Sequence, residues 1–358
     1  MREDRRSRKA PPGLFAAVSF ALSAVLMPAA AYLPGFADRY RDWCYRPAAA
    51  LVGRAAGLFP FSLSEVLLLL LLWGLLAGIA SCIRGKLRCR SLFLRILSAC
   101  GALCLLYTLF CGINYRAEAF SSQASLVPGK SSTAELEELC RYTAEQVNLR
   151  AEALEAGRIP SLREQAGEGR KAMEALGEEF PMLGGRYPRP KYLMFSRLLS
   201  VQQITGIYSP LAVEACVNRE IPGYNLPFTI CHELSHLRGY MREDEANFIA
   251  FLAASRSEDP WFSYSGWLSG WVYAGNALAS ADREAFREIH GTLCERAKED
   301  LAENNRFWEQ YEGAPAETHE KLNDAYLKAN GQTGGTKSYG RMVDLMLEYA
   351  RQHPFAEL

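Results

Sequence analysis

Three long apolar stretches in the N-terminal third constrain the fold of this chain more than any other feature. They cover residues 14–33, 66–83 and 96–115, and none contains a charged side chain. A helix of about 20 apolar residues crosses the hydrocarbon core of a bilayer, and it satisfies its own backbone groups while doing so. The first stretch also has the basic flank of a signal peptide, but its length and the two further stretches favour an anchor. We expect residues 1–115 to form an α-helical membrane anchor with three spans.

Lys and Arg are distributed unevenly around these stretches, which predicts their orientation. Five lie in residues 1–9 and five in residues 84–95, against four in residues 39–54. Positive residues in short loops favour the cytoplasmic side. We therefore predict a multi-pass protein of the cell membrane with a cytoplasmic N-terminus. After three spans, residues 116–358 would lie outside the cytoplasm.

Residues 232–236 read His-Glu-Leu-Ser-His, the HExxH pattern. Positions i and i+4 share one helix face, so His232 and His236 can direct both imidazoles at one metal ion. Glu233 lies beside them, where a carboxylate can take a proton from a metal-activated water. The pattern alone occurs by chance, but the preceding residues favour a helix, with Asn225 as its N-cap and Pro227 in its first turn.

The residues after the motif offer acidic side chains for a third ligand. Gly239 predicts the end of the first helix, so a second helix can begin near residue 242. Glu243 shares a face with small residues, which would allow close approach, whereas Glu245 heads a large apolar face. We predict Glu243 as the third ligand, with Glu245 as the alternative, and Asn247 one turn on as a residue that orients a ligand. Two imidazoles and a carboxylate suit one catalytic Zn²⁺ per chain.

These residues resemble the gluzincin group of zinc metallopeptidases, in which HExxH is followed by a helix carrying Glu-x-x-x-Asp. Here the second motif spans residues 243–247 and ends in Asn rather than Asp. The chain as a whole is similar to a bacterial membrane family of unknown function that combines HExxH with the motif REDEANF, here residues 242–248. Its further motifs correspond to residues 326–332 and 338–345. The resemblance implies zinc-dependent peptide hydrolysis.

Residues 116–358 are long enough for one domain. We expect a mainly α, α+β zincin-like domain with a small sheet next to the HExxH helix, from β-type segments at residues 192–196, 201–208 and 212–218. Residues 206–218 are a candidate edge for an extended substrate, although a hairpin within the core fits equally well. The aromatic residues at 261–273 either line a groove or form helix core, and core is the more common case. His290 and His319, on polar helices, are expected in solvent rather than in a metal site.

The leading hypothesis from sequence is a membrane-anchored zinc metallopeptidase. His232, His236 and Glu243 would hold the metal, and Glu233 would act as general base and then as proton donor. The alternative is a non-catalytic zinc-binding sensor or scaffold of the cell envelope, favoured by Asn247 and by the short interval between the two motifs. A purely structural membrane protein would bind no metal. The expected partners are the lipid bilayer and an unidentified protein or peptide substrate, since the evenly mixed charge gives no sign of nucleic-acid binding.

Overall fold

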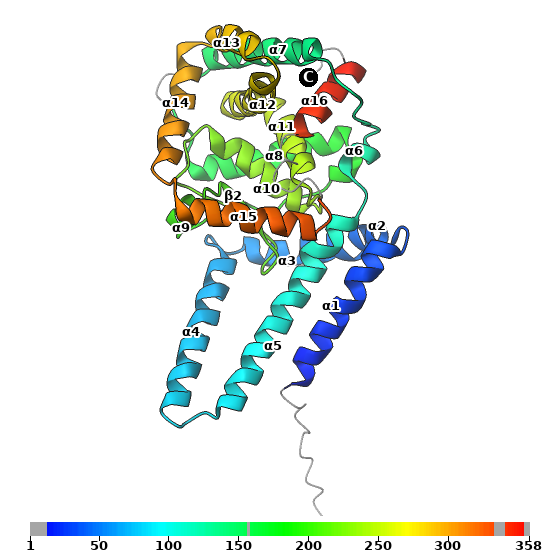
Figure 1. Ribbon diagram of the computed structural model, residues 1–358, viewed down its shortest axis with the longest axis vertical. Coiled ribbons are helices and arrows are strands. Elements are labelled where there is room, and N and C mark those ends of the chain that lie inside the picture. Colours follow the sequence, from blue (N-terminus) through cyan, green and yellow to red (C-terminus); the bar gives the residue numbers. More distant parts are fainter. Residues whose placement is uncertain (1–12, 156–157, 333–340, 354–358) are drawn as a thin grey trace, which may run out of the picture.

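The computed structural model describes residues 13–155, 158–332 and 341–353. Three apolar helices near the N-terminus project from a helical domain (Figure 1). They are α1 (Leu14–Tyr32), α4 (Leu63–Ile83) and α5 (Cys89–Tyr107), which continues through the π turn η2 (Thr108–Gly112) and the 3₁₀ turn η3 (Ile113–Arg116). Each is long and apolar enough to cross a membrane. The predicted three-helix apolar region is confirmed to this extent, while the basic residues 1–9 lie outside the described residues.

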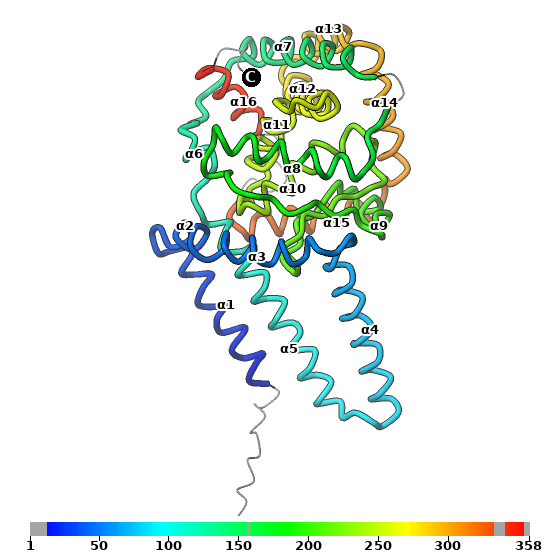
Figure 2. The backbone as a smooth tube through the Cα atoms, turned by 180° about the vertical axis from the view of Figure 1, so that it is seen from behind, coloured from blue at the N-terminus to red at the C-terminus, as the bar shows by residue number. Residues whose placement is uncertain are grey.

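The segment between the first two apolar helices is helical, although the sequence was interpreted as a loop there. It comprises α2 (Phe36–Tyr40), the π turn η1 (Arg41–Tyr45) and α3 (Arg46–Gly57), and it runs crosswise beneath the domain (Figures 1 and 2). Tyr45 and Ala49 are buried in the same hydrophobic core as the HExxH helix. Residues 36–57 therefore pack with the domain, although they fall within the predicted 1–115 membrane region.

The rest of the described chain is mostly helical, with its longest buried helices stacked at the centre. Hydrogen-bonded capping boxes start two of these helices, one from Ser132 with Glu135 and the other from Ser161 with Glu164. The helices are α6 (Phe120–Gln123), α7 (Thr133–Glu152), α8 (Leu162–Glu179), η4 (Pro181–Leu183), α9 (Ser196–Ser200), α10 (Asn225–Leu237), α11 (Glu243–Ser255), α12 (Pro260–Ala281), α13 (Arg283–Gly291), α14 (Glu295–Glu309), α15 (Ala314–Ala329) and α16 (Met342–Gln352).

Helices α10, α11 and α12 form the centre of the core. The aromatic residues of α12 are largely buried there, and Trp267 and Tyr264 are among the most completely enclosed side chains. Gly266 lets α12 approach α11 closely, since a Cβ atom at this position would lie 2.3 Å from the backbone nitrogen of Ser255. The aromatic stripe predicted at residues 261–273 is thus mainly helix core.

A three-stranded sheet lies against α10. Its strands are β1 (Lys191–Tyr192), β2 (Gly206–Ser209) and β3 (Glu214–Val217), in the order β1-β3-β2. β1 pairs parallel to β3, whereas β2 pairs antiparallel to β3 and forms an edge. The small sheet is confirmed, but two predicted segments were wrong in extent. The segment predicted at residues 192–196 is extended only to Tyr192, because α9 begins at Ser196. The segment predicted at residues 201–208 becomes a strand, β2, only from Gly206.

Candidate metal centre

Helix α10 carries the HExxH motif through the core. Its N-terminal cap is Tyr224 rather than the predicted Asn225, whose side chain instead donates to Asn304. The helix ends where predicted, since Gly239 has the positive φ of 99° that glycine accommodates. This turn brings the Tyr240 carbonyl to within 2.8 Å of His236 Nδ1. Because a carbonyl only accepts, Nδ1 of His236 carries the proton and Nε2 keeps its lone pair.

The structure brings the three predicted ligands together. His232 Nε2 and His236 Nε2 lie 3.0 Å apart. Glu243, in the first turn of α11, places Oε2 3.3 Å from His232 Nε2 and Oε1 3.7 Å from His236 Nε2. One ligand atom from each residue falls within 4.8 Å of the others. Small residues on α11 make this possible, because Ala246 and Ala250 are fully buried between the packed helices.

This arrangement fits a zinc ion. Ligand atoms bound at about 2.0–2.1 Å in tetrahedral geometry lie about 3.3 Å from one another. The two imidazole nitrogens are 3.0 Å apart, and each lies 3.3 or 3.7 Å from one of the two carboxylate oxygens of Glu243, which is close to that value. Two imidazoles with one carboxylate are also the donor set of catalytic rather than structural zinc. Among the described residues, neither His290 nor His319 belongs to the cluster, and His290 instead contacts aromatic rings of the core.

The electrostatics of the cluster differ at its three residues, with one neutral imidazole, one imidazole whose charged form is favoured and one anionic carboxylate. Burial lowers the pKa of His236 to about 4, so this ring is neutral at pH 7. Burial also opposes the charge on His232, but the hydrogen bond and charge of Glu243 outweigh it, and the pKa of His232 is raised. The same contacts outweigh burial at Glu243 and lower the pKa of its carboxyl. Glu243 is therefore an anion facing two imidazoles.

Glu233 lies on the sheet side of the cluster. Its carboxylate is buried, Oε2 has no hydrogen-bond partner, and burial raises its pKa to about 8. The first residue of β2 approaches it closely, since a Cβ atom on Gly206 would lie only 2.6 Å from Glu233 Oε1. The carboxyl is thus poised to exchange a proton near neutral pH, directly beneath the edge strand.

The two further polar residues of α11 have distinct surroundings. The Asn247 side chain hydrogen-bonds His232 and stabilises its protonated form, as an amide oxygen does. The Glu245 carboxylate instead accepts hydrogen bonds from the backbone of Phe120 and from Ser121 Oγ, the latter at 2.7 Å. The structure therefore brings Glu243 to the histidines and engages Glu245, the alternative ligand, elsewhere.

Two tyrosines lie near the site, of which Tyr45 was missed at the sequence level and Tyr273 was considered only as part of the aromatic stripe at residues 261–273. Tyr45, from the crosswise segment, donates to the carbonyl of Leu237 at the end of α10 at 2.9 Å. Tyr273, on α12, lies near Glu243, and burial together with that negative charge raises the pKa of its phenol. Tyr45 belongs to no local motif, because it reaches the site only through packing of distant elements.

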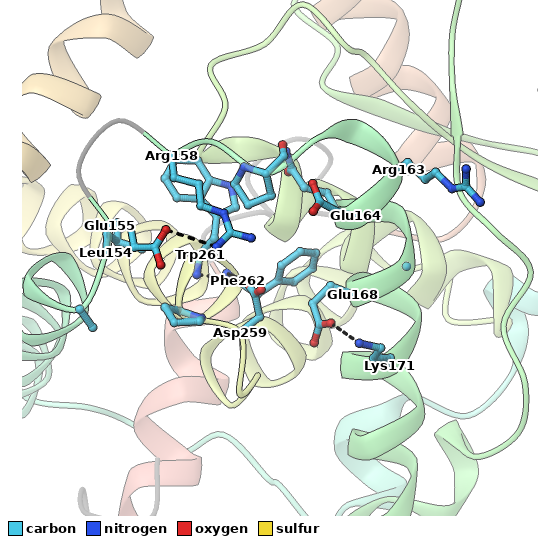
Figure 3. A pocket seen from close by; sticks show the side chains of 15 residues that line it. Leu154, Glu155, Arg158, Arg163, Glu164, Glu168, Lys171, Asp259, Trp261 and Phe262 are labelled. Atoms are coloured by element: carbon cyan, nitrogen blue, oxygen red, sulfur yellow. Dashed lines mark hydrogen bonds and ion pairs between the residues drawn. The ribbon is translucent and has the colours of Figure 1, made fainter.

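A cavity of about 520 Å³ lies apart from the metal cluster, between the C-terminal end of α7 and the first turns of α8 and α12 (Figure 3). The charged groups around it largely pair with one another. Arg158 contacts Glu155 at 3.3 Å and Lys171 contacts Glu168 at 2.9 Å. The cavity contains none of the clustered metal-ligand candidates.

Fold and cluster together define a helical protein with three apolar helices of membrane-spanning length and a His/His/Glu site in its domain. The chain belongs to the family described as "Protein of unknown function (DUF3810)", which matches residues 40–347. No curated protein and no solved structure matches the chain. The family match covers residues 40–57 of the crosswise segment, the two later apolar helices and all three residues of the candidate metal cluster.

Proposed function

We propose that this protein is a membrane-anchored, zinc-dependent metallopeptidase of zincin-like architecture. The observation that carries the proposal is the juxtaposition of His232, His236 and Glu243 with a buried Glu233 whose pKa is raised to about 8. A structural zinc site would need the first three residues only. The added acid/base group is what hydrolysis requires.

Each residue has a role in the proposed reaction. A zinc ion held by His232, His236 and Glu243 would supply Lewis-acid activation of water and of a peptide carbonyl. Glu233 takes the proton of the attacking water and then delivers it to the leaving amine. Asn247 orients the His232 ring, and the Tyr240 carbonyl fixes the tautomer of His236.

The edge strand β2 supports an extended peptide as substrate. One side of β2 pairs with β3, and its other side is a sheet edge. A peptide can add to such an edge through main-chain hydrogen bonds. Since Gly206 lies against Glu233, a strand added there would pass over the general base. Of the predicted edge at residues 206–218, this geometry supports the β2 part as a substrate edge, whereas residues 214–217 form the central strand of the sheet.

The alternative is a zinc-binding sensor or scaffold without turnover. Its support is the unusual second motif, in which Asn247 leaves its amide nitrogen buried without a partner. A sensor would need the three ligands but would have no use for the carboxyl of Glu233. The peptidase and the sensor therefore differ in whether the carboxyl of Glu233 is needed.

The test compares the purified full-length protein with two variants. We expect about one zinc per chain in the wild type and in Glu233→Gln, and little in His236→Ala, which removes a ligand. Hydrolysis of a peptide library should be lost in both variants. Zinc binding with equal hydrolysis by wild type and Glu233→Gln would refute the assignment of the base. Zinc binding without any hydrolysis by the wild type would favour the sensor.

A further inference from the structure

The metal site is tied by hydrogen bonds to the domain ends of two apolar helices. The Glu65 carboxylate, in the first turn of α4, accepts the backbone N–H groups of Met194 and Phe195 at 3.0 and 2.9 Å. Tyr208 of β2 donates to the carbonyl of Phe110, in the last turns of the α5 helix, at 2.9 Å. These contacts fix α9 and the edge strand at the level where the apolar helices enter the domain.

The crosswise segment 36–57 exposes apolar side chains on the side away from the domain. Residues spaced by three or four positions, among them Arg41, Tyr45 and Ala49, are buried against the domain. On the opposite side, Trp43 is 81% exposed and Leu51 is also strongly exposed. This segment lies between the domain and the level of α4 and α5 (Figures 1 and 2). Its apolar side therefore faces the region from which those helices project.

The sheet and α9 extend the same apolar surface toward the metal site. Leu198 on α9 is 62% exposed, and Ile207 on β2 is 47% exposed. Ile207 pairs with Cys216, whose sulfur lies 3.7 Å from Ser62 Oγ just before α4. Side chains of directly paired residues share one face of a sheet. Ile207 thus points toward the side of α4, whereas its neighbour Gly206 lies against Glu233.

We propose that this surface, formed by Trp43, Leu51, Leu198 and Ile207, rests in the interface of the lipid bilayer. The bilayer is the occupant because α3 leads into α4, and hydrogen bonds hold the start of α9 and strand β2 at the domain ends of α4 and α5, which are apolar enough to cross it. An in-plane helix with Trp and Leu on one side is typical of this location. The free edge of β2 would then lie close to the bilayer surface, so it can pair only with a polypeptide segment that also lies close to that surface. The substrate class is therefore a membrane-anchored polypeptide, cleaved just outside its own span.

This inference rests on the proposed peptidase function, so its test separates the two. Seating in the bilayer is measured without any substrate. A fluorescent non-natural residue is placed at position 198, or at position 149 as control, in the full-length protein in lipid nanodiscs. Leu149 is similarly exposed at 54%, but it lies on α7 at the far end of the domain. We expect brominated lipids to quench emission at position 198 only. Equal emission at the two positions would overturn the proposal that this surface lies in the bilayer interface.

The substrate class is measured with two matched peptide libraries. One varies about ten residues directly after a single membrane span, a length of about 33 Å when extended, and the other carries the same residues without the span. The zinc-loaded wild type should cleave the anchored library about 10-fold faster or more, because anchoring raises the effective concentration at the site. Equal rates would overturn the substrate class and leave the peptidase standing. Cleavage of neither library, with emission at position 198 still quenched, would refute hydrolysis and the substrate class but not the seating.

A pair of surface variants connects the two measurements. Leu198→Asp places a charge in the proposed interface, whereas Leu149→Asp makes the same change on the far side of the domain. We expect the first to slow cleavage of the anchored library several-fold, with the zinc content and the slower cleavage of soluble peptides unchanged. Leu51→Asp, in the crosswise segment, should also slow cleavage of the anchored library. Because this residue is not on α9, a shared effect could not come from a local folding defect there. Equal effects of the variants at positions 198 and 149 would contradict the proposal.

Discussion

At the residue scale, two glutamates two positions apart on α11 have different tasks. Glu243 faces the histidine pair, and Glu245 accepts hydrogen bonds from the Phe120–Ser121 backbone and hydroxyl. The sequence favoured Glu243 from the small residues on its face, and the geometry supports that choice. The backbone partners of Glu245 were not predictable, because they come from a segment more than 100 positions away in sequence.

The pair Glu243→Gln and Glu245→Gln tests this division. The first variant should lose zinc affinity by more than the roughly 10–100-fold that a change beside a metal ligand costs. The second should keep zinc but lose about 1–2 kcal/mol of stability, since a neutral amide replaces the charged carboxylate that accepts from three donors. A competing zinc dye and thermal unfolding measure the two properties. The assignment of Glu243 fails if the losses are exchanged.

At the element scale, the packing of the helix pair behind the metal site depends on a close approach at Gly266. A Cβ atom there would meet the α11 backbone at Ser255. Gly266→Ala should therefore push α12 away and destabilise the fold by about 1–3 kcal/mol. Gly167→Ala is the matched control, because a Cβ atom in this turn of α8 meets nothing within 4 Å. It should stabilise the helix by about 0.5–1 kcal/mol. Unfolding temperatures that shift in the same direction would contradict this packing argument.

Local patterns predicted the elements whose signals are local. The HExxH helix, its end at Gly239 and the start of the next helix follow from spacing and turn chemistry within about 30 residues. Segment 36–57 was missed because its pattern is inverted: it buries Arg41 and small residues and exposes Trp43 and Leu51. Residues 192–196 were expected to be extended, but β1 ends at Tyr192, and Glu65 of α4 binds the backbone N–H groups of Met194 and Phe195 just before α9. That long-range contact has no signature in the local sequence.

At the scale of the whole molecule, the arginines between α1 and α4 hold the domain against the apolar helices. Arg41 is buried, donates to the carbonyl of Glu118 at 2.7 Å and lies 3.4 Å from Asp38. Arg46 pairs with Asp42 at 2.9 Å and donates to the carbonyl of Met182. Both were counted as loop charges in the orientation argument.

The predicted orientation, with the domain outside the cytoplasm, can be tested by cysteine labelling in intact cells. Residues 34–62 and the domain lie at one end of the apolar helices, and the turn at 84–88 lies at the other (Figure 1). In a Cys44→Ser background, a membrane-impermeant maleimide should label Glu152→Cys on α7 directly. Cys89, exposed at the start of α5, should react only after permeabilisation. The reverse pattern would place the metal site in the cytoplasm, and the candidate substrates would then be the cytoplasmic flanks of membrane spans. The orientation therefore decides which side of the membrane supplies the proposed substrate, whereas the geometry of the candidate metal site is the same in either case.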